Sequence, residues 1–437
     1  MAEIRPFRGV RYNKRLVQDI SSVICPPYDI ITPEMAQELH RRSEYGFIKL
    51  EHGQQLPSDT DEDNKYTRSA AILRNWLEEG VLKPDVLPAL YLHQHRFSHN
   101  GSRYRRRGII AAVRLEEWNR MVIRPHENTR VKPKSDRLNL LWALQANTSP
   151  VFSMFEDRGQ QIAALSADQE WAQPIIEITG SGEEHRIWAV TDPEIVSRIA
   201  ACLSDRPLYI ADGHHRYESA LNYQKERLTC YPSASGDEDF NFVMMELVDF
   251  NDPGLIILSP HRLVRGLSKA TLAELKSKLA TLFQIEELPL KTPDISRQID
   301  DLLAGDKTDR GRIVLFGLSP GNLLLLDMSD FAAASKMMPY FHSELYNRLD
   351  VSIVDHVILE KMIGMTGEQE ETSLAFNHDK ADVINRVLNH EYQLAFFLGP
   401  VRTEVIRAIA DAGDRMPRKS TYFYPKPPSG LVFRRLE

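Results

Sequence analysis

Apolar and polar positions over 185–221 follow the periods of a strand, a helix, a second strand, a polar turn and a second helix. The first helix is expected to begin at Asp192, a good N-cap that is followed by proline. The apolar run 207–211 predicts a short buried strand, and helical spacing resumes after Tyr217. A strand-to-helix corner is therefore expected at 212–217.

The same two periods recur along the rest of the chain and indicate a mixed α/β (α+β) fold. Two β-prone runs flank Asn100-Gly101, which is a strong hairpin signal. The length predicts several domains. We expect an N-terminal α/β region with this hairpin (1–120), a core (121–264), a smaller α/β domain (265–330) and a C-terminal α/β region with a basic, aromatic tail (331–437).

His93 and His95 belong to the first strand of the hairpin, where side chains two residues apart point to the same side. Two histidines can begin a metal site, but no third ligand lies nearby in the sequence. We therefore expect this pair on a half-exposed surface of the sheet.

The corner carries chemistry that suits an anion. Gly213 lets backbone come close to a ligand, and the new helix offers free N–H groups. Arg216 has a planar fork that suits phosphate. Asp212 can orient a histidine or hold Mg²⁺, while His214 or His215 can act as an acid near neutral pH. The corner is therefore expected to bind phosphate or a nucleotide.

The order of elements and the box at this corner resemble the core of the ParB/sulfiredoxin-like superfamily. The box consists of Gly213, His215, Arg216, Tyr217 and Ala220. The resemblance implies a ParB/sulfiredoxin-like nucleotide-binding core in which Gly213, Arg216 and Tyr217 hold the phosphates. His214 occupies the position of the catalytic cysteine of sulfiredoxins, so reduction of sulfinic acids is not expected. The run 212–216 is most similar to the free serine kinases.

Motifs over almost the whole chain resemble a large prokaryotic family that is defined by a domain of unknown function. These motifs are RPFRG at 5–9, ICPPYD at 24–29, PHENT at 125–129, DGHHRY at 212–217, NDPG at 251–254 and KSTYFYP at 419–425. Membership implies a shared function without naming it.

In the free serine kinases a glutamate N-terminal to the Asp-Gly-His-His-Arg run is the catalytic base, and by this resemblance Glu127 is our candidate. A salt-bridged loop is the alternative role for its segment. The candidate catalytic residues are thus Glu127, Asp212, His214 and His215. Candidates that support the site or contact the substrate are Tyr28, Asp29, His126, Asn128, Arg137 and Tyr422.

The tail contains eight Lys/Arg and four Asp/Glu from position 402 to the end. Lys419, Ser420 and Thr421 are candidate phosphate ligands there, with Lys419 as a point charge in a tail that closes the site. A stacking surface for nucleic acid and a plain terminal strand are the alternatives.

Composition limits the partners and the cellular compartment that we expect. A net charge of −7 argues against broad nucleic-acid binding. The sequence contains no apolar run of membrane-spanning length, and its start does not resemble a signal peptide. Three scattered cysteines indicate a reducing compartment, and we expect a cytoplasmic protein. The oligomeric state, including a homo-oligomer, stays open.

These observations favour a nucleotide-dependent phosphotransfer that involves a small hydroxyl compound, with serine as the first candidate. ATP or ADP and Mg²⁺, the latter at Asp212, are the expected cofactors. A hydrolase that acts on phosphoserine is the first alternative. A nucleotide-gated binding protein similar to ParB is the second, and it is less favoured because no basic recognition helix follows Ala220.

Overall fold

The computed structural model describes residues 2–128, 131–170, 172–180, 182–304 and 311–436, without the side chains of 131–133 and 168. The chain forms two compact units: Met1–Pro125, Thr129–Ile256 and Pro425–Glu437 make the first, while His126–Asn128 and Ile257–Tyr424 make the second. The four contiguous regions drawn from the sequence remain a prediction.

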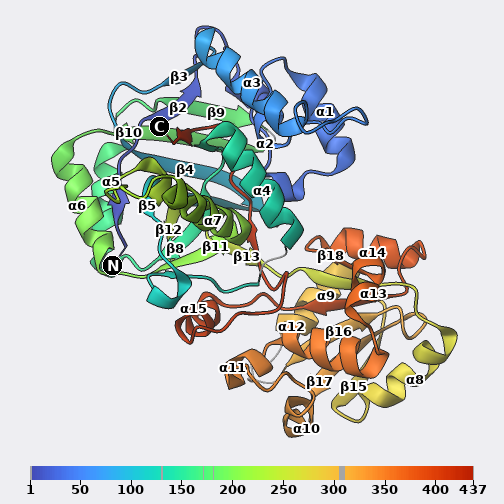
Figure 1. The fold of residues 1–437 in the computed structure, drawn as a ribbon. Helices are drawn as coiled ribbons and strands as arrows, with labels where there is room; N and C mark the ends of the chain where they lie inside the picture. The colour runs from blue at the N-terminus through green and yellow to red at the C-terminus, as the bar shows by residue number, and fades with distance from the viewer. Residues whose placement is uncertain (1, 129–130, 171, 181, 305–310, 437) are drawn as a thin grey trace. The chain divides into compact units, whose positions relative to one another are not determined.

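A nine-stranded sheet organises the first unit, within the part of the chain that is described (Figure 1). Its order is β6-β11-β8-β12-β5-β4-β10-β9, with β1 paired to β5. The strands are β1 (Ile4–Arg5), β4 (Leu90–His99), β5 (Ser102–Arg114), β6 (Ile123–Arg124), β8 (Val151–Phe155), β9 (Ile176–Gly180), β10 (Glu183–Val190), β11 (Leu208–Asp212) and β12 (Phe242–Asp249).

Both faces of this sheet bury apolar side chains. Leu39, Trp76 and Phe433 belong to one apolar cluster with sheet residues, whereas Ile199 and Tyr217 belong to a second. The helices are α1 (Pro33–Arg42), α2 (Ile48–Glu51), α3 (Lys65–Glu78), α4 (Val131–Leu144), α5 (Gln161–Gln169), α6 (Pro193–Ser204) and α7 (His214–Cys230). A smaller sheet has the order β3-β2-β21-β7, from β2 (Gly9–Tyr12), β3 (Leu82–Pro84), β7 (Ala146–Asn147) and β21 (Phe433–Arg435).

The second unit is built on a six-stranded sheet in the order β15-β17-β16-β19-β14-β18. The strands are β14 (His261–Val264), β15 (Phe283–Pro289), β16 (Arg312–Phe316), β17 (Asn322–Met328), β18 (Leu374–Asn377) and β19 (Leu394–Leu398). Its helices are α8 (Lys269–Leu279), α9 (Ile295–Ala304), α10 (Phe331–Ser335), α11 (Glu344–Asn347), α12 (Asp350–Ser352), α13 (Gly367–Ser373), α14 (Lys380–Leu388) and α15 (Thr403–Asp411), with a π-helix at Ile353–Ile363. Two further strands, β13 (Ile256–Leu258) and β20 (Tyr422–Tyr424), pair with each other.

The predicted fold class is confirmed, since the chain is a mixed α/β protein. Asn100 and Gly101 both have positive φ, 48° and 76°, as the tight turn between β4 and β5 requires. Asp192 caps α6 through its side chain, and the strand-to-helix corner at 212–214 is present. None of the helices in the described segments is long and apolar enough to cross a membrane.

Candidate functional site

An ion pair within its own turn holds the corner between β11 and α7. Gly213 joins the two elements with a φ of 94°, which glycine adopts without steric cost. Arg216 folds back on this turn, donating from Nη2 to Asp212 Oδ2 at 2.7 Å. Its Nη1 donates to Ser149 Oγ at 3.1 Å and to the Pro150 carbonyl oxygen. A Cβ at position 213 would lie 3.0 Å from the Arg216 Nε, so the glycine also leaves room for the guanidinium.

A lysine from the C-terminal segment of the first unit joins this corner. Lys426 Nζ lies 2.7 Å from Asp212 Oδ1 and also pairs with Asp29, and its side chain is only 4% exposed. Burial lowers the pKa of Lys426, but the two carboxylates outweigh burial and hold the pKa above its ordinary value. Two carboxylates, of Asp29 and Asp212, and two cations, Arg216 and Lys426, therefore meet where α7 begins.

Tyr28 and Asp29 lie in a single 3₁₀ turn, Tyr28–Ile30, that follows Pro27. The Arg137 guanidinium carbon of α4 lies 4.1 Å from the centre of the Tyr28 ring. Burial raises the pKa of Tyr28 to about 12, although the charges of Arg137 and Arg216 oppose the rise. The sequence-predicted residues Tyr28, Asp29 and Arg137 thus gather with the corner in the first unit.

Three further residues of the run 212–217 differ in exposure. His214 is buried and His215 is half-buried. Tyr217 is fully buried, and its hydroxyl donates to the Glu116 carbonyl oxygen at 2.8 Å and accepts from the Glu116 N–H at 2.9 Å. Burial raises the pKa of Tyr217. These contacts give Tyr217 a packing role in the apolar cluster beside α7.

The second unit brings together two other predicted segments, 126–128 and 419–422. The Nε2 of His126 and the Oγ1 of Thr421 lie 3.0 Å apart. The Ser420 backbone N–H donates to Glu127 Oε1 at 2.9 Å. The HENT segment and the tail motif therefore contact each other within this unit.

The other members of these segments have individual surroundings. Asn128 is exposed. Lys419 has a positive φ of 56°, and its carbonyl oxygen accepts from Arg262 Nη1 at 3.0 Å. The Tyr422 ring stacks on His378 with ring centroids 4.0 Å apart. The expected approach of Glu127 and the tail to Asp212 remains a prediction, and Thr129 lies outside the described residues.

Sequence reasoning passed over Lys426 as a site residue. Its signal was present, because Lys426 directly follows the KSTYFYP motif at 419–425 and prolines stand on both sides of it. We expected Lys419 to supply the point charge of the tail, but Lys426 is the lysine that pairs with Asp212 in the structure.

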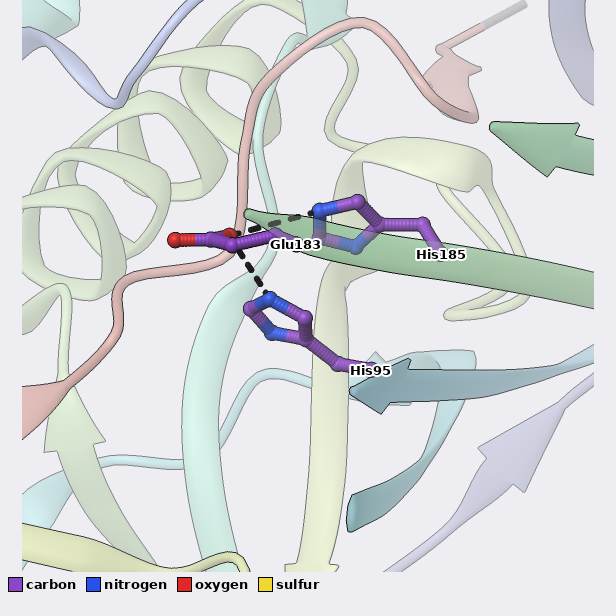
Figure 2. A group of neighbouring side chains, drawn as sticks. All are labelled: His95, Glu183 and His185. Atoms are coloured by element: carbon purple, nitrogen blue, oxygen red, sulfur yellow. Dashed lines mark hydrogen bonds and ion pairs between the residues drawn. The ribbon is translucent and has the colours of Figure 1, made fainter. Parts of the chain in front are cut away.

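The expectation for His93 and His95 is wrong, because both side chains are buried. Strand β10 pairs with β4 and places polar side chains next to them. His185 lies directly opposite His95, and Glu183 of the same strand joins the cluster (Figure 2). Glu183 Oε2 is 2.7 Å from His95 Nε2 and 3.5 Å from His185 Nε2. Burial lowers the pKa of His95 to about 3 and also lowers the pKa of His185, because burial disfavours the charged form of each ring.

Comparison with known protein families shows which family the chain belongs to. The family described as "Protein of unknown function (DUF1015)" matches residues 4–352. The chain belongs to this family. The tail motif at 419–425 of this DUF1015 protein lies beyond the end of the match. Among curated proteins, nothing matches it.

Solved structures with a similar arrangement have low identity to this DUF1015 protein. A free serine kinase variant in complex with AMP is 10% identical, with 72% of this chain and 86% of that chain covered and a TM-score of 0.35. A conserved hypothetical protein from Pyrococcus furiosus is 11% identical, with 74% and 94% covered and a TM-score of 0.35. C-terminally truncated SbnI from Staphylococcus aureus is 10% identical, with 73% and 84% covered and a TM-score of 0.34. A likeness of this extent says nothing about ligands or activity.

Proposed function

We propose that the corner of the first unit binds the phosphates of ATP or ADP together with Mg²⁺, and that the protein transfers a phosphoryl group to or from a small hydroxyl compound such as serine. The observation that carries the proposal is the charge network of Asp29, Asp212, Arg216 and Lys426 at the start of α7. Four charged side chains from three distant segments meet there.

The four charged side chains can exchange one another for phosphate and Mg²⁺, and the charges stay balanced. Phosphate oxygens accept hydrogen bonds from the guanidinium of Arg216 and the ammonium of Lys426. The first turn of α7 adds backbone N–H donors. The carboxylates of Asp29 and Asp212 are then released, and carboxylate oxygens are ligands that Mg²⁺ accepts. A magnesium–nucleotide pair therefore replaces both kinds of internal partner at once, so nucleotide affinity should depend on Mg²⁺.

Glu127 is the proposed general base, on the resemblance to the free serine kinases. Its Oε1 accepts the Ser420 N–H, a bond that orients the carboxylate. A base in this reaction has to reach the hydroxyl of the acceptor. Glu127→Gln should therefore abolish transfer while nucleotide binding persists.

Phosphorus NMR tests the reaction. The protein is incubated with serine, Mg²⁺ and either ATP or ADP, and we expect a phosphoserine resonance that Glu127→Gln does not produce. The doubly substituted variant Asp29→Asn with Lys426→Met should also fail, since it removes one carboxylate and one cation from the network. Release of inorganic phosphate from phosphoserine without a nucleotide would instead favour the hydrolase. No phosphoserine from a folded protein with either nucleotide would refute the transfer to serine.

A further inference from the structure

The histidine cluster of the first unit is assembled from three strands that share one sheet. His93 and His95 belong to β4, Glu183 and His185 to β10, and Glu246 to β12. All five side chains but that of Glu183 are almost fully buried, and Glu183 is half-buried. In Figure 2 one carboxylate oxygen of Glu183 faces a ring nitrogen of His95 and a ring nitrogen of His185. So many polar groups in an interior require a complete set of partners.

The hydrogen bonds can be assigned from the acceptor end of the cluster. A carboxylate only accepts, so His93 Nδ1 donates to Glu246 Oε1 at 2.8 Å. The Nε2 of His93 and the Nδ1 of His185 lie 3.0 Å apart, so one of these two nitrogens donates to the other. The other ring nitrogen of His185, Nε2, lies 3.5 Å from Glu183 Oε2.

The hydrogen bonds assigned from the donor end of the cluster also lead to Glu183. A guanidinium only donates, so Arg106 Nη2 donates to His95 Nδ1 at 3.1 Å. The proton of a neutral His95 is then on Nε2, which donates to Glu183 Oε2 at 2.7 Å. Glu183 Oε2 therefore faces a ring nitrogen of both His95 and His185.

We propose that His185, Glu183 and His95 bind one divalent transition-metal ion of the Zn²⁺ class. Their ligand atoms all lie within 4.8 Å of one another. Two imidazoles and one carboxylate form a donor set that Zn²⁺ accepts, whereas Mg²⁺ prefers oxygen ligands. His95 binds through Nε2 once its proton has moved to Nδ1. That N–H then faces the Arg106 guanidinium, so His95 is the weakest of the three ligands.

The surroundings of His185 fit a metal ligand. With a metal on its Nε2, His185 would keep its proton on Nδ1 and donate to His93, and His93 donates in turn to Glu246, a chain that fixes the ring. Glu246 reaches His93 from β12 across the intervening strand β5, at Gly108. A Cβ at position 108 would lie 2.6 Å from Glu246 Oε1, so a glycine is needed there. Ordered outer partners of this kind are typical of histidines that bind metals.

Titration calorimetry of the full chain tests the site. After treatment with a chelator, wild type should bind one Zn²⁺ or Co²⁺ per chain, and Mg²⁺ should not compete. His185→Gln and Glu183→Gln should each weaken Zn²⁺ binding by more than about a hundredfold, with a smaller loss for His95→Gln. His93→Gln, which removes an outer partner, should weaken it by about 10–100-fold. His390→Asn, a change at an exposed histidine, is the matched control and should bind as wild type does.

Two results would overturn the metal site. The first is a stripped wild type that binds neither Zn²⁺ nor Co²⁺, which would mean that the three side chains only hydrogen-bond to one another. The second is wild-type affinity in His185→Gln and Glu183→Gln, with folding checked by circular dichroism. Should these variants not fold, wild type alone decides. Zn²⁺ must then raise the melting temperature of the stripped protein more than Mg²⁺ does, and equal shifts would overturn the site.

Discussion

Asp212 accepts from two cations, because Arg216 holds its Oδ2 and Lys426 holds its Oδ1. The side chains of these cations are 11% and 4% exposed. Removal of either one takes a charged partner away from a partly buried carboxylate, which is costly. A single substitution at this corner should therefore lower both stability and ligand affinity. A paired substitution that preserves the net charge separates the two effects.

At the residue scale, Asp350 gives the second unit a pH-dependent stability. Burial raises the pKa of Asp350 from its ordinary 3.8 to about 7, although a backbone hydrogen bond from Arg312 opposes the rise. The folded state therefore keeps a proton that the unfolded chain has released. This contribution to the free energy of unfolding is complete below pH 3.8 and is lost as the pH rises through about 7.

Asp350→Asn removes this ionisation and should raise the melting temperature at pH 8 relative to wild type. The difference between the two proteins should shrink as the pH falls to 4, since both side chains are then neutral. Thermal melts of both proteins between pH 4 and pH 8 measure it. A difference that does not change with pH would contradict the shifted pKa.

At the element scale, local sequence signals predicted the turn and the helix start that they determine. Asn100-Gly101 indicated the turn between β4 and β5, and Asp192 indicated the start of α6. The histidine cluster was not predictable, because it depends on the pairing of β4 with β10, far apart in the sequence. His185 stands at the start of its predicted strand as a lone histidine, and no local pattern says which strand it will face.

The crossing of Glu246 over β5 gives a test at this scale. Gly108→Ala should lower the free energy of unfolding by about 1–3 kcal/mol, because the added methyl collides with a buried carboxylate. Urea unfolding measures it. Gly180→Ala in β9 is the control, since a Cβ there would meet only Ser21 at 3.5 Å, an ordinary contact. Equal effects of the two substitutions would show that the crossing is not tightly packed.

At the scale of the whole molecule, each of the two compact units combines segments that are far apart in the sequence. The segment Pro425–Glu437 belongs to the first unit, and His126–Asn128 belongs to the second. The sequence indicated which motifs carry chemistry, but composition and periodicity give no sign of where a chain returns to an earlier unit. The tail was therefore assigned as one piece, although Lys419 and Lys426 belong to different units.

Calorimetric titration of ADP or ATP, with and without Mg²⁺, tests the central claim most directly. Wild type should bind the nucleotide only with Mg²⁺, and the double variant Asp29→Asn with Lys426→Met should bind about ten- to a hundredfold more weakly, the loss expected for a charge-assisted bond. Asp300→Asn with Lys380→Met removes a similar ion pair from the second unit and should retain wild-type affinity. Absence of binding to wild type, or equal affinity in wild type and the double variant, would contradict the proposed phosphate site.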